Sequence, residues 1–150
     1  MLKFVSKYFR QLTLEELHDL FVLRSEVFVV EQDCIYQDID GKDPKGIHIL
    51  GLDRKKKIAA YARVLPKEES YSSYVSIGRL VVSKAFRGKN YGHDLVKKGI
   101  EEAIKLDATS LIKISAQAHL VSFYNSHGFI VDGEAYLEDG IPHIAMTFKP

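Results

Sequence analysis

Residues 74–106 limit most strongly what this chain can fold into. An apolar strand pattern at 74–82 runs into a short basic loop, and the loop leads directly into an amphipathic helix pattern at 91–106. A strand, a tight loop and a helix in this order indicate an α/β protein. The apolar positions of the helix pattern recur at helical spacing, at Leu95, Val96, Gly99, Ile100, Ala103 and Ile104.

The loop between this strand and this helix has the residues of an anion site. Gly88, Asn90 and Gly92 permit a tight backbone path with positive φ angles and a close approach to a ligand. Amides at a helix N-terminus bind anions without any side-chain charge, and Arg87 and Lys89 add two cations. A diphosphate suits this arrangement. The alternative is an ordinary turn with glycines only where a turn needs them.

Two nucleotide-binding motifs do not fit this loop. A Walker A loop requires GxxxxGK[ST], and a dinucleotide fingerprint requires GxGxxG after the first strand of a βαβ unit. Neither spacing is met in residues 78–92. A phosphate-binding module for nucleotides is therefore disfavoured.

The rest of the chain also alternates strand and helix patterns. Thr13 and Glu16 predict a capping box at the start of a helix that extends to Val27 or Phe28. A polar loop follows at 31–46, and a short helix at 119–126 ends at Gly128. Strands are predicted at 4–12, 46–53, 58–65, 74–82, 111–117 and 141–148. The order β-α-β-β-β-α-β-α-β predicts a mixed sheet with helices on its faces.

Length, charge and cysteine content exclude several classes of protein. The 150 residues, 46% of them hydrophobic, suffice for one domain, which we place at 1–150. With 21 basic and 20 acidic residues, the chain lacks the basic surplus of a nucleic-acid binder. Cys34 is the only cysteine, so no internal disulfide forms. Without a signal-peptide pattern or an apolar run near ~20 residues, we expect a cytoplasmic protein without a membrane partner.

Two segments resemble motifs of the GNAT acetyltransferase superfamily. Residues 87–92, Arg-Gly-Lys-Asn-Tyr-Gly, match the cofactor motif Arg/Gln-x-x-Gly-x-Gly/Ala except at Asn90, where Gly is usual. Asn is the non-glycine residue that best tolerates the left-handed conformation. Residues 117–129, Gln-Ala-His-Leu-Val-Ser-Phe-Tyr-Asn-Ser-His-Gly-Phe, resemble Asn-x-x-Ala-x-x-Phe-Tyr-x-x-x-Gly-Phe, with Gln117 where Asn is commoner. Segments 23–32, 38–43 and 137–146 resemble the ElaA-like branch.

The resemblance implies an α/β GNAT fold, with a mixed, mostly antiparallel central sheet flanked by helices. It implies acetyl-CoA as co-substrate, and it implies that Tyr124 protonates the departing CoA thiolate. With a reference pKa of about 10, a tyrosine is protonated at neutral pH. Without the resemblance, Tyr124 is better explained as a packing residue beside Phe123. The implied cofactor-binding residues are Leu80, Val81, Val82, Arg87, Gly88, Lys89, Asn90, Tyr91, Gly92 and Gln117.

The acceptor side is less well defined. An alkylammonium acceptor must lose a proton before it attacks, and Glu31, His48 and His143 are the candidate bases, each with a surface group as the alternative. Arg24 and Gln32 complete the candidate substrate-binding residues. Arg24 would pair with Glu31 or with an anionic group of the acceptor, or be an ordinary ion-paired arginine. The six histidines have no zinc spacing, so we expect no metal.

Two functions stay open at this point. The first is an N-acetyltransferase that moves an acetyl group from acetyl-CoA to a primary amine of a small molecule or peptide, by direct attack in a ternary complex. The second is a non-catalytic acyl-CoA-binding sensor or interaction module, which the departures at Asn90 and Gln117 would suit. Cys34 is better explained as a plain loop thiol than as an acyl carrier. The sequence leaves open the acceptor and the oligomeric state, a homodimer included.

Overall fold

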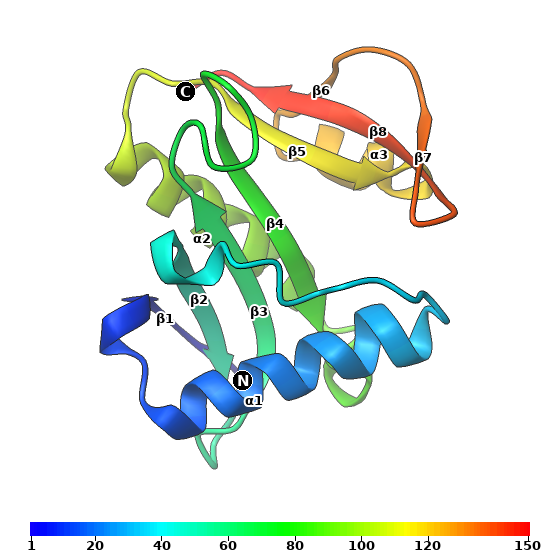
Figure 1. Ribbon diagram of the computed structural model, residues 1–150. Coiled ribbons are helices and arrows are strands. Elements are labelled where there is room, and N and C mark those ends of the chain that lie inside the picture. Colours follow the sequence, from blue (N-terminus) through cyan, green and yellow to red (C-terminus); the bar gives the residue numbers. More distant parts are fainter.

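The computed structural model describes all residues, 1–150 (Figure 1). A π-helical segment, Ser25–Glu31, extends the first helix, and three-residue 3-10 turns lie at Phe9–Gln11, Asp43–Lys45, Lys84–Phe86 and Ala118–Leu120. The strands and α-helices are β1 (Lys3–Tyr8), α1 (Leu14–Arg24), β2 (Ile47–Leu52), β3 (Ile58–Leu65), β4 (Val75–Val82), α2 (Tyr91–Leu106), β5 (Ile112–Gln117), α3 (Val121–Asn125), β6 (Ile130–Val131), β7 (Tyr136–Glu138) and β8 (Ile141–Phe148).

All eight strands belong to one sheet, in the order β1-β2-β3-β4-β5-β8-β6, with β7 paired to β8. Every neighbouring pair is antiparallel except β4 and β5, which are parallel. The predicted mixed, mostly antiparallel sheet is therefore confirmed. Helices α1 and α2 cover opposite faces of it (Figure 1).

The parallel pair β4–β5 is short. Only Val75 with Ile112 and Ser76 with Lys113 are paired, and beyond them the two strands diverge (Figure 1). The register of β4 against β3 also shifts near Arg79, whose φ is 53°. Such a bulge bends the strand that carries it. Residues 79–82 of β4 consequently have no strand partner on the β5 side.

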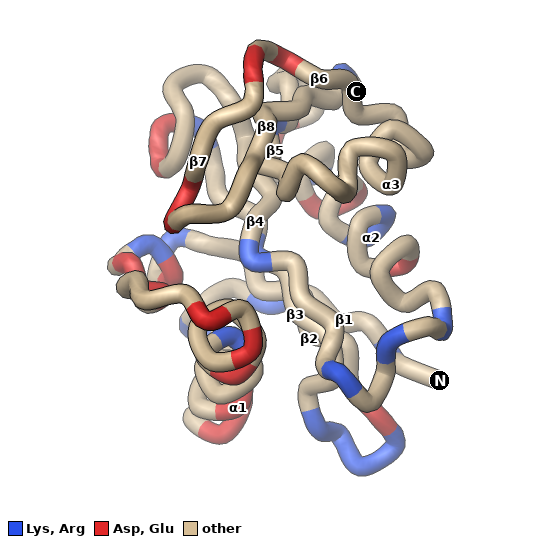
Figure 2. Tube along the Cα trace, turned by 90° about the vertical axis from the view of Figure 1, so that its right-hand side faces the viewer, with Lys and Arg blue, Asp and Glu red and all other residues tan.

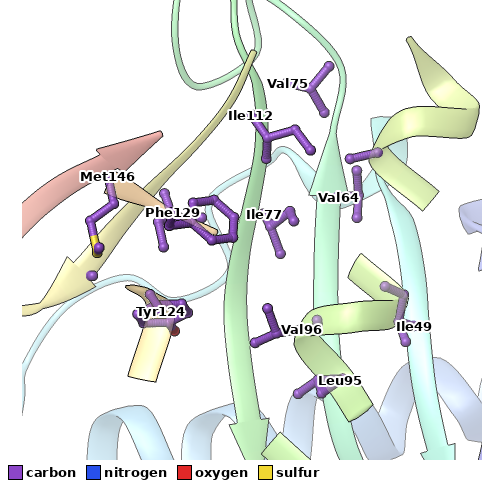
Figure 3. Packing of buried hydrophobic residues seen from close by; sticks show 14 of the residues in the cluster. Ile49, Val64, Val75, Ile77, Leu95, Val96, Ile112, Tyr124, Phe129 and Met146 are labelled. Atoms are coloured by element: carbon purple, nitrogen blue, oxygen red, sulfur yellow. The ribbon is translucent and has the colours of Figure 1, made fainter. Parts of the chain in front are cut away.

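The largest buried cluster fills the space between the sheet and α2, and it continues beneath β5 and β8 (Figure 3). Leu95 and Val96 of α2 pack there with apolar residues of β2, β3 and β4. Gly99 lets the helix approach the sheet closely, because a Cβ at this position would lie 3.2 Å from Ile77 Cγ2. Tyr124 and Phe129 extend the cluster to the second half of the molecule. This core therefore fixes α3 relative to β4.

The predicted elements differ from the observed ones at a few places. The first strand ends at Tyr8 rather than at residue 12, because residues 9–11 form a 3-10 turn that leads to the capping residue Thr13. The prediction missed β6 and β7, which have two and three residues, all of them in exposed positions. Such short strands leave almost no period-2 pattern in the sequence.

Charges are distributed locally rather than on one large face. Figure 2 shows acidic positions along α1 and basic positions at the turn between β2 and β3. Residues 54–57 of that turn are Arg-Lys-Lys-Lys. No helix has both the length and the apolar character that crossing a membrane requires.

Candidate active site

A cavity of about 500 Å³ lies where β4 and β5 diverge. Residues 76–80 of β4, two residues of β3 and three residues of β5 line it. Its other walls come from Leu120 and α3, Phe28 of the π-helical segment, the loop at 32–42, residues 70–71, and β7 and β8 with the turn between them. The divergence of two sheet strands therefore creates a concave site that residues from both halves of the sheet line.

Tyr124 lies on α3 and lines this cavity with only 8% of its surface exposed. Its ring makes edge contacts with Phe123 and Phe129, at centroid distances of 5.1 and 6.0 Å. Burial raises the pKa of Tyr124 to about 12. The phenol therefore keeps its proton at neutral pH and is available as a donor.

The end of α3 holds the backbone of Tyr124. Gly128 has a φ of 93°, its N–H donates to the Asn125 carbonyl at 3.0 Å, and the Phe129 N–H donates to the Tyr124 carbonyl at 3.2 Å. These two bonds form a Schellman motif. The predicted cap at Gly128 is therefore confirmed.

The predicted phosphate loop leads into α2, outside the cavity. Asn90 is the N-cap residue of α2, with φ 65° and ψ 14°, and its side chain makes no capping hydrogen bond. Gly88 has a φ of 79°, and a Cβ there would meet nothing within 4 Å. The backbone thus adopts at Asn90 the left-handed conformation that glycine usually supplies. The His93 N–H already donates to the Asn90 carbonyl at 3.1 Å, so the amides of Tyr91 and Gly92, which precede it, are the ones left to bind an anion.

Strand β4 connects the cavity to this loop. Leu80 lines the cavity, whereas Val81 is buried against α1 and is thus outside the cavity wall. The Val82 carbonyl accepts a hydrogen bond from Arg87 Nε at 2.9 Å, which ties the loop to the end of the strand. The residues predicted to bind the cofactor, 80–82 and 87–92, form one continuous path from the cavity to the N-terminus of α2.

Arg87 and Glu31 form an ion pair. Arg87 Nη1 and Nη2 donate to the two Glu31 carboxylate oxygens at 2.8 and 3.1 Å. Arg87 lowers the pKa of Glu31. Glu31 is thus paired and does not line the cavity, so the structure does not bring this candidate base to Tyr124.

Arg24 is fully buried and bound to aspartates rather than to Glu31. Its Nε donates to Asp38 Oδ2 at 2.8 Å, and its Nη1 donates to Asp43 Oδ1 at 2.6 Å. The expected pairing with Glu31 is therefore wrong, and the ordinary ion-paired arginine is what the structure shows. Arg24 does not line the cavity.

A network of six charges surrounds Arg24. Arg63 binds Asp40 with both terminal nitrogens, at 2.9 and 2.8 Å, and also contacts Asp43 Oδ1 at 2.9 Å. Arg79 lies 2.8 Å from Asp38 and 3.4 Å from Asp40. The three arginines and three aspartates fix the loop at 38–43 to α1, β3 and β4. Through Asp40, Arg63 and Arg79 the network also forms one wall of the cavity.

The two candidate histidines have different surroundings. His48 is buried outside the cavity, where its Nδ1 lies 2.6 Å from the Tyr61 hydroxyl and its Nε2 lies 2.9 Å from the Asp43 carbonyl. Burial lowers the pKa of His48, and the structure does not bring this candidate base to the cavity. His143 does line the cavity, together with Gln32 and Gln117.

The cavity also contains residues that the sequence did not single out. Tyr36, Ser70, Tyr71 and Ser115 line it, and Glu138 lies beside His143. Tyr71 and Ser115 come from segments far from either motif, and a single polar residue in a loop or strand gives no signal of its own. No group of three or more His, Cys, Asp or Glu side chains is placed to hold a metal.

Comparison with known proteins identifies the family. Residues 10–150 match the model of the acetyltransferase (GNAT) domain. Protein ElaA of Escherichia coli is 43% identical over 149 residues, which cover 98% of this chain and 96% of that protein. The crystal structure of E. coli ElaA has a TM-score of 0.92 and covers 99% of this chain and 100% of its own. An acyl-CoA N-acyltransferase from Pseudomonas aeruginosa, 41% identical, also has a TM-score of 0.92, with 99% of each chain covered. The chain belongs to the GNAT acetyltransferase family, and within it the chain is similar to ElaA.

Proposed function

We propose that the protein transfers the acetyl group of acetyl-CoA to a primary amine of a small molecule or peptide, by direct attack in a ternary complex. The family makes it an acyltransferase, and the acetyl donor and the amine acceptor are the finer part of the proposal. The observation that carries it is the alignment of three features along one strand: the cavity with Tyr124, the unpaired edge of β4, and the left-handed loop before α2. We also propose a cytoplasmic location.

Different residues along this strand and loop would bind different parts of acetyl-CoA. The loop residues 87–92 would bind the diphosphate through backbone amides at the N-terminus of α2. The free edge of β4 at residues 80–82 would bind pantetheine, and Gln117 faces the same gap from β5. The new C–N bond forms as the C–S bond breaks, and the Tyr124 phenol donates its proton to the departing sulfur.

The proposal is tested by measuring thiol release from acetyl-CoA with a broad panel of amines. With an acceptor identified, Tyr124→Phe should lower kcat by about 10²–10⁴-fold, because general acid catalysis contributes about this much. The ring and its contacts remain, so acetyl-CoA should raise the melting temperature of this variant as it does that of the wild type.

Tyr8→Phe is the matched control, because Tyr8 is 60% exposed and lies outside the cavity. An unchanged kcat in Tyr124→Phe, with chemistry shown to be rate-limiting, would contradict the role of Tyr124 as the acid. Binding of acetyl-CoA without turnover of any amine would instead favour the non-catalytic sensor.

A further inference from the structure

The hydrogen bond of His143 fixes which of its two ring nitrogens carries a proton. Nδ1 lies 2.7 Å from the Ile141 carbonyl oxygen. A carbonyl oxygen only accepts hydrogen bonds, so Nδ1 must be the donor. In the neutral imidazole, Nε2 then has the free lone pair. His143 is thus set up to accept a proton at Nε2.

The surroundings hold the ring in one orientation at the cavity wall. His143 is 7% exposed, and its ring stacks on Tyr136 with centroids 6.3 Å apart and an angle of 24°. Tyr136 is itself fixed, because its hydroxyl is hydrogen-bonded to Ser115 Oγ. On β8, His143 pairs with Gln117 of β5 on one side and Tyr136 of β7 on the other. The strand register therefore brings it beside the gap where β4 and β5 diverge.

A carboxylate lies next to the free nitrogen. Glu138 Oε2 is 3.5 Å from His143 Nε2, and the Glu138 side chain is 50% exposed. Such an exposed carboxylate attracts a cation that enters from solvent. Asp139, the next residue, is exposed and lines the same side of the cavity.

Apart from the exposed carboxylates Glu138 and Asp139, the groups that could accept a proton at the cavity have a partner or a raised pKa. Asp40 is bound by Arg63 and Arg79, which together lower its pKa against the effect of burial. Burial raises the pKa of Cys34, whose Sγ donates to the Asp139 carbonyl at 3.1 Å. Tyr71, which faces Tyr136 and Glu138, has a pKa raised to about 12, mainly by burial. Among the buried groups of the cavity, His143 Nε2 is the acceptor that remains.

We propose that His143 is the general base that prepares the acceptor amine for attack. The inference rests on the proposed function and extends it to cationic primary amines. The acceptor enters as an ammonium ion, attracted by Glu138, and gives one N–H proton to His143 Nε2. The freed nitrogen lone pair forms the C–N bond with the thioester carbonyl carbon. As the C–S bond breaks, sulfur takes the Tyr124 proton, the amide nitrogen loses its second proton to the Tyr124 oxygen, and His143 returns its proton to solvent.

His143→Asn tests this step by its pH dependence. The Asn amide can still donate to the Ile141 carbonyl from near the Nδ1 position, but it has no basic nitrogen. At about pH 7, kcat/KM for an amine acceptor should fall about 10²–10⁴-fold. The deficit should shrink to less than about tenfold near pH 10, because about 28% of an alkylamine with a pKa of about 10.4 is then deprotonated in solution, against about 0.04% at pH 7, so the reaction depends far less on a base.

His18→Gln is the matched control, because His18 is exposed on α1 and lies outside the cavity. It should follow the wild-type pH profile. Equal losses in His143→Asn at every pH, or no loss at all, would overturn the base assignment and leave the proposed acetyl transfer intact. A wild type that releases no thiol with any amine would overturn both proposals.

The tautomer provides a second test that needs no acceptor. The ¹⁵N chemical shifts of the neutral His143 ring, assigned by comparison with His143→Asn, should show a protonated Nδ1 and an unprotonated Nε2. A ring protonated at Nε2 would overturn the proposal, because the lone pair would then point to the Ile141 carbonyl.

Discussion

Asn90 is the residue at which this chain departs from the usual cofactor loop, and its conformation explains why the departure is tolerated. Its φ of 65° lies in the left-handed region, which Asn adopts more readily than other residues with a side chain. The side chain makes no capping hydrogen bond, so the backbone conformation is what the position requires.

Substitutions at Asn90 should therefore follow backbone preference. Asn90→Gly should bind acetyl-CoA as well as the wild type, because glycine adopts this φ without strain. Asn90→Val should raise the dissociation constant about tenfold or more, because a β-branched residue is strained there by about 1–3 kcal/mol. Calorimetric titration measures both. A large loss of affinity in Asn90→Gly would show that the Asn90 side chain contacts the cofactor.

Local chemistry at single residues was largely predictable from the sequence. The capping box is confirmed: Thr13 Oγ1 accepts from the Glu16 N–H at 3.0 Å, and the Thr13 N–H donates to Glu16 Oε1 at 2.9 Å. The cap at Gly128 followed from the same kind of short-range rule. The partners of Arg24 did not, because Asp38 and Asp43 lie 14 and 19 residues away in a loop without periodicity.

At the scale of elements, two histidines join the predicted phosphate loop to the helix of Tyr124. His93 lies in the first turn of α2 and His127 lies just beyond α3, and His93 Nδ1 is 2.9 Å from His127 Nε2. Phe123 packs against both rings, at centroid distances of 4.8 and 5.4 Å. In the neutral pair, one N–H proton bridges these two nitrogens. When both rings are protonated, each facing nitrogen has a proton, the hydrogen bond is lost and two positive charges are in contact. The contact between α2 and α3 is therefore sensitive to acid.

Stability should consequently fall with pH through this contact. Burial, His93 and Lys97 lower the pKa of His127 below its ordinary 6.5. Between the lowered pKa of His127 in the folded protein and its pKa of 6.5 in the unfolded chain, the unfolded chain binds more protons than the folded one. The stabilisation from neutral His127 is therefore complete above pH 6.5 and is lost as the pH falls below it. The melting temperature should drop between about pH 7.5 and 5.5, and His127→Asn should reduce that drop.

Burial also lowers the pKa of His48, so His48 adds to the loss of stability at low pH, equally in the wild type and in His127→Asn. The difference in melting temperature between the wild type and His127→Asn therefore isolates the effect of His127. His119→Asn, at an exposed position outside this contact, is the control. An equal drop in the wild type and in His127→Asn would show that the histidine pair does not couple stability to pH.

Elements with strong periodicity were predictable, and irregular ones were not. The sequence predicts α2 with its observed bounds, Tyr91–Leu106, because an apolar stripe and a glycine-containing loop mark it. The continuation of α1 as a π-helix at Ser25–Glu31 has no comparable signal. Yet this segment brings Phe28 to the cavity and Glu31 to Arg87. The sequence therefore predicted the regular element α2 better than the irregular segment that lines the cavity.

At the scale of the whole molecule, the cavity depends on contacts between segments that are distant in the sequence. Its lining runs from Phe28 to His143, and the loop that forms its outer wall is held by the six-charge network. Hydrophobic periodicity cannot predict such a network, because charged residues in a loop carry no period. Cys34 adds a further long-range link, from its Sγ to the Asp139 carbonyl across 105 residues of sequence.

Removal of Arg24 should therefore destabilise the fold strongly. In Arg24→Leu, Asp38 and Asp43 each lose a buried cationic partner, and the contacts of the guanidinium with the Phe21 and Tyr61 rings are lost as well. Breaking a buried ion pair from one side costs about 3–5 kcal/mol. Lys7→Ala, which removes a half-exposed partner of Glu16, should cost about 1 kcal/mol or less. Urea unfolding of the two variants and the wild type measures both free energies. An Arg24→Leu variant within about 1 kcal/mol of the wild type would show that the remaining arginines, Arg63 and Arg79, suffice to compensate the aspartates and hold the loop.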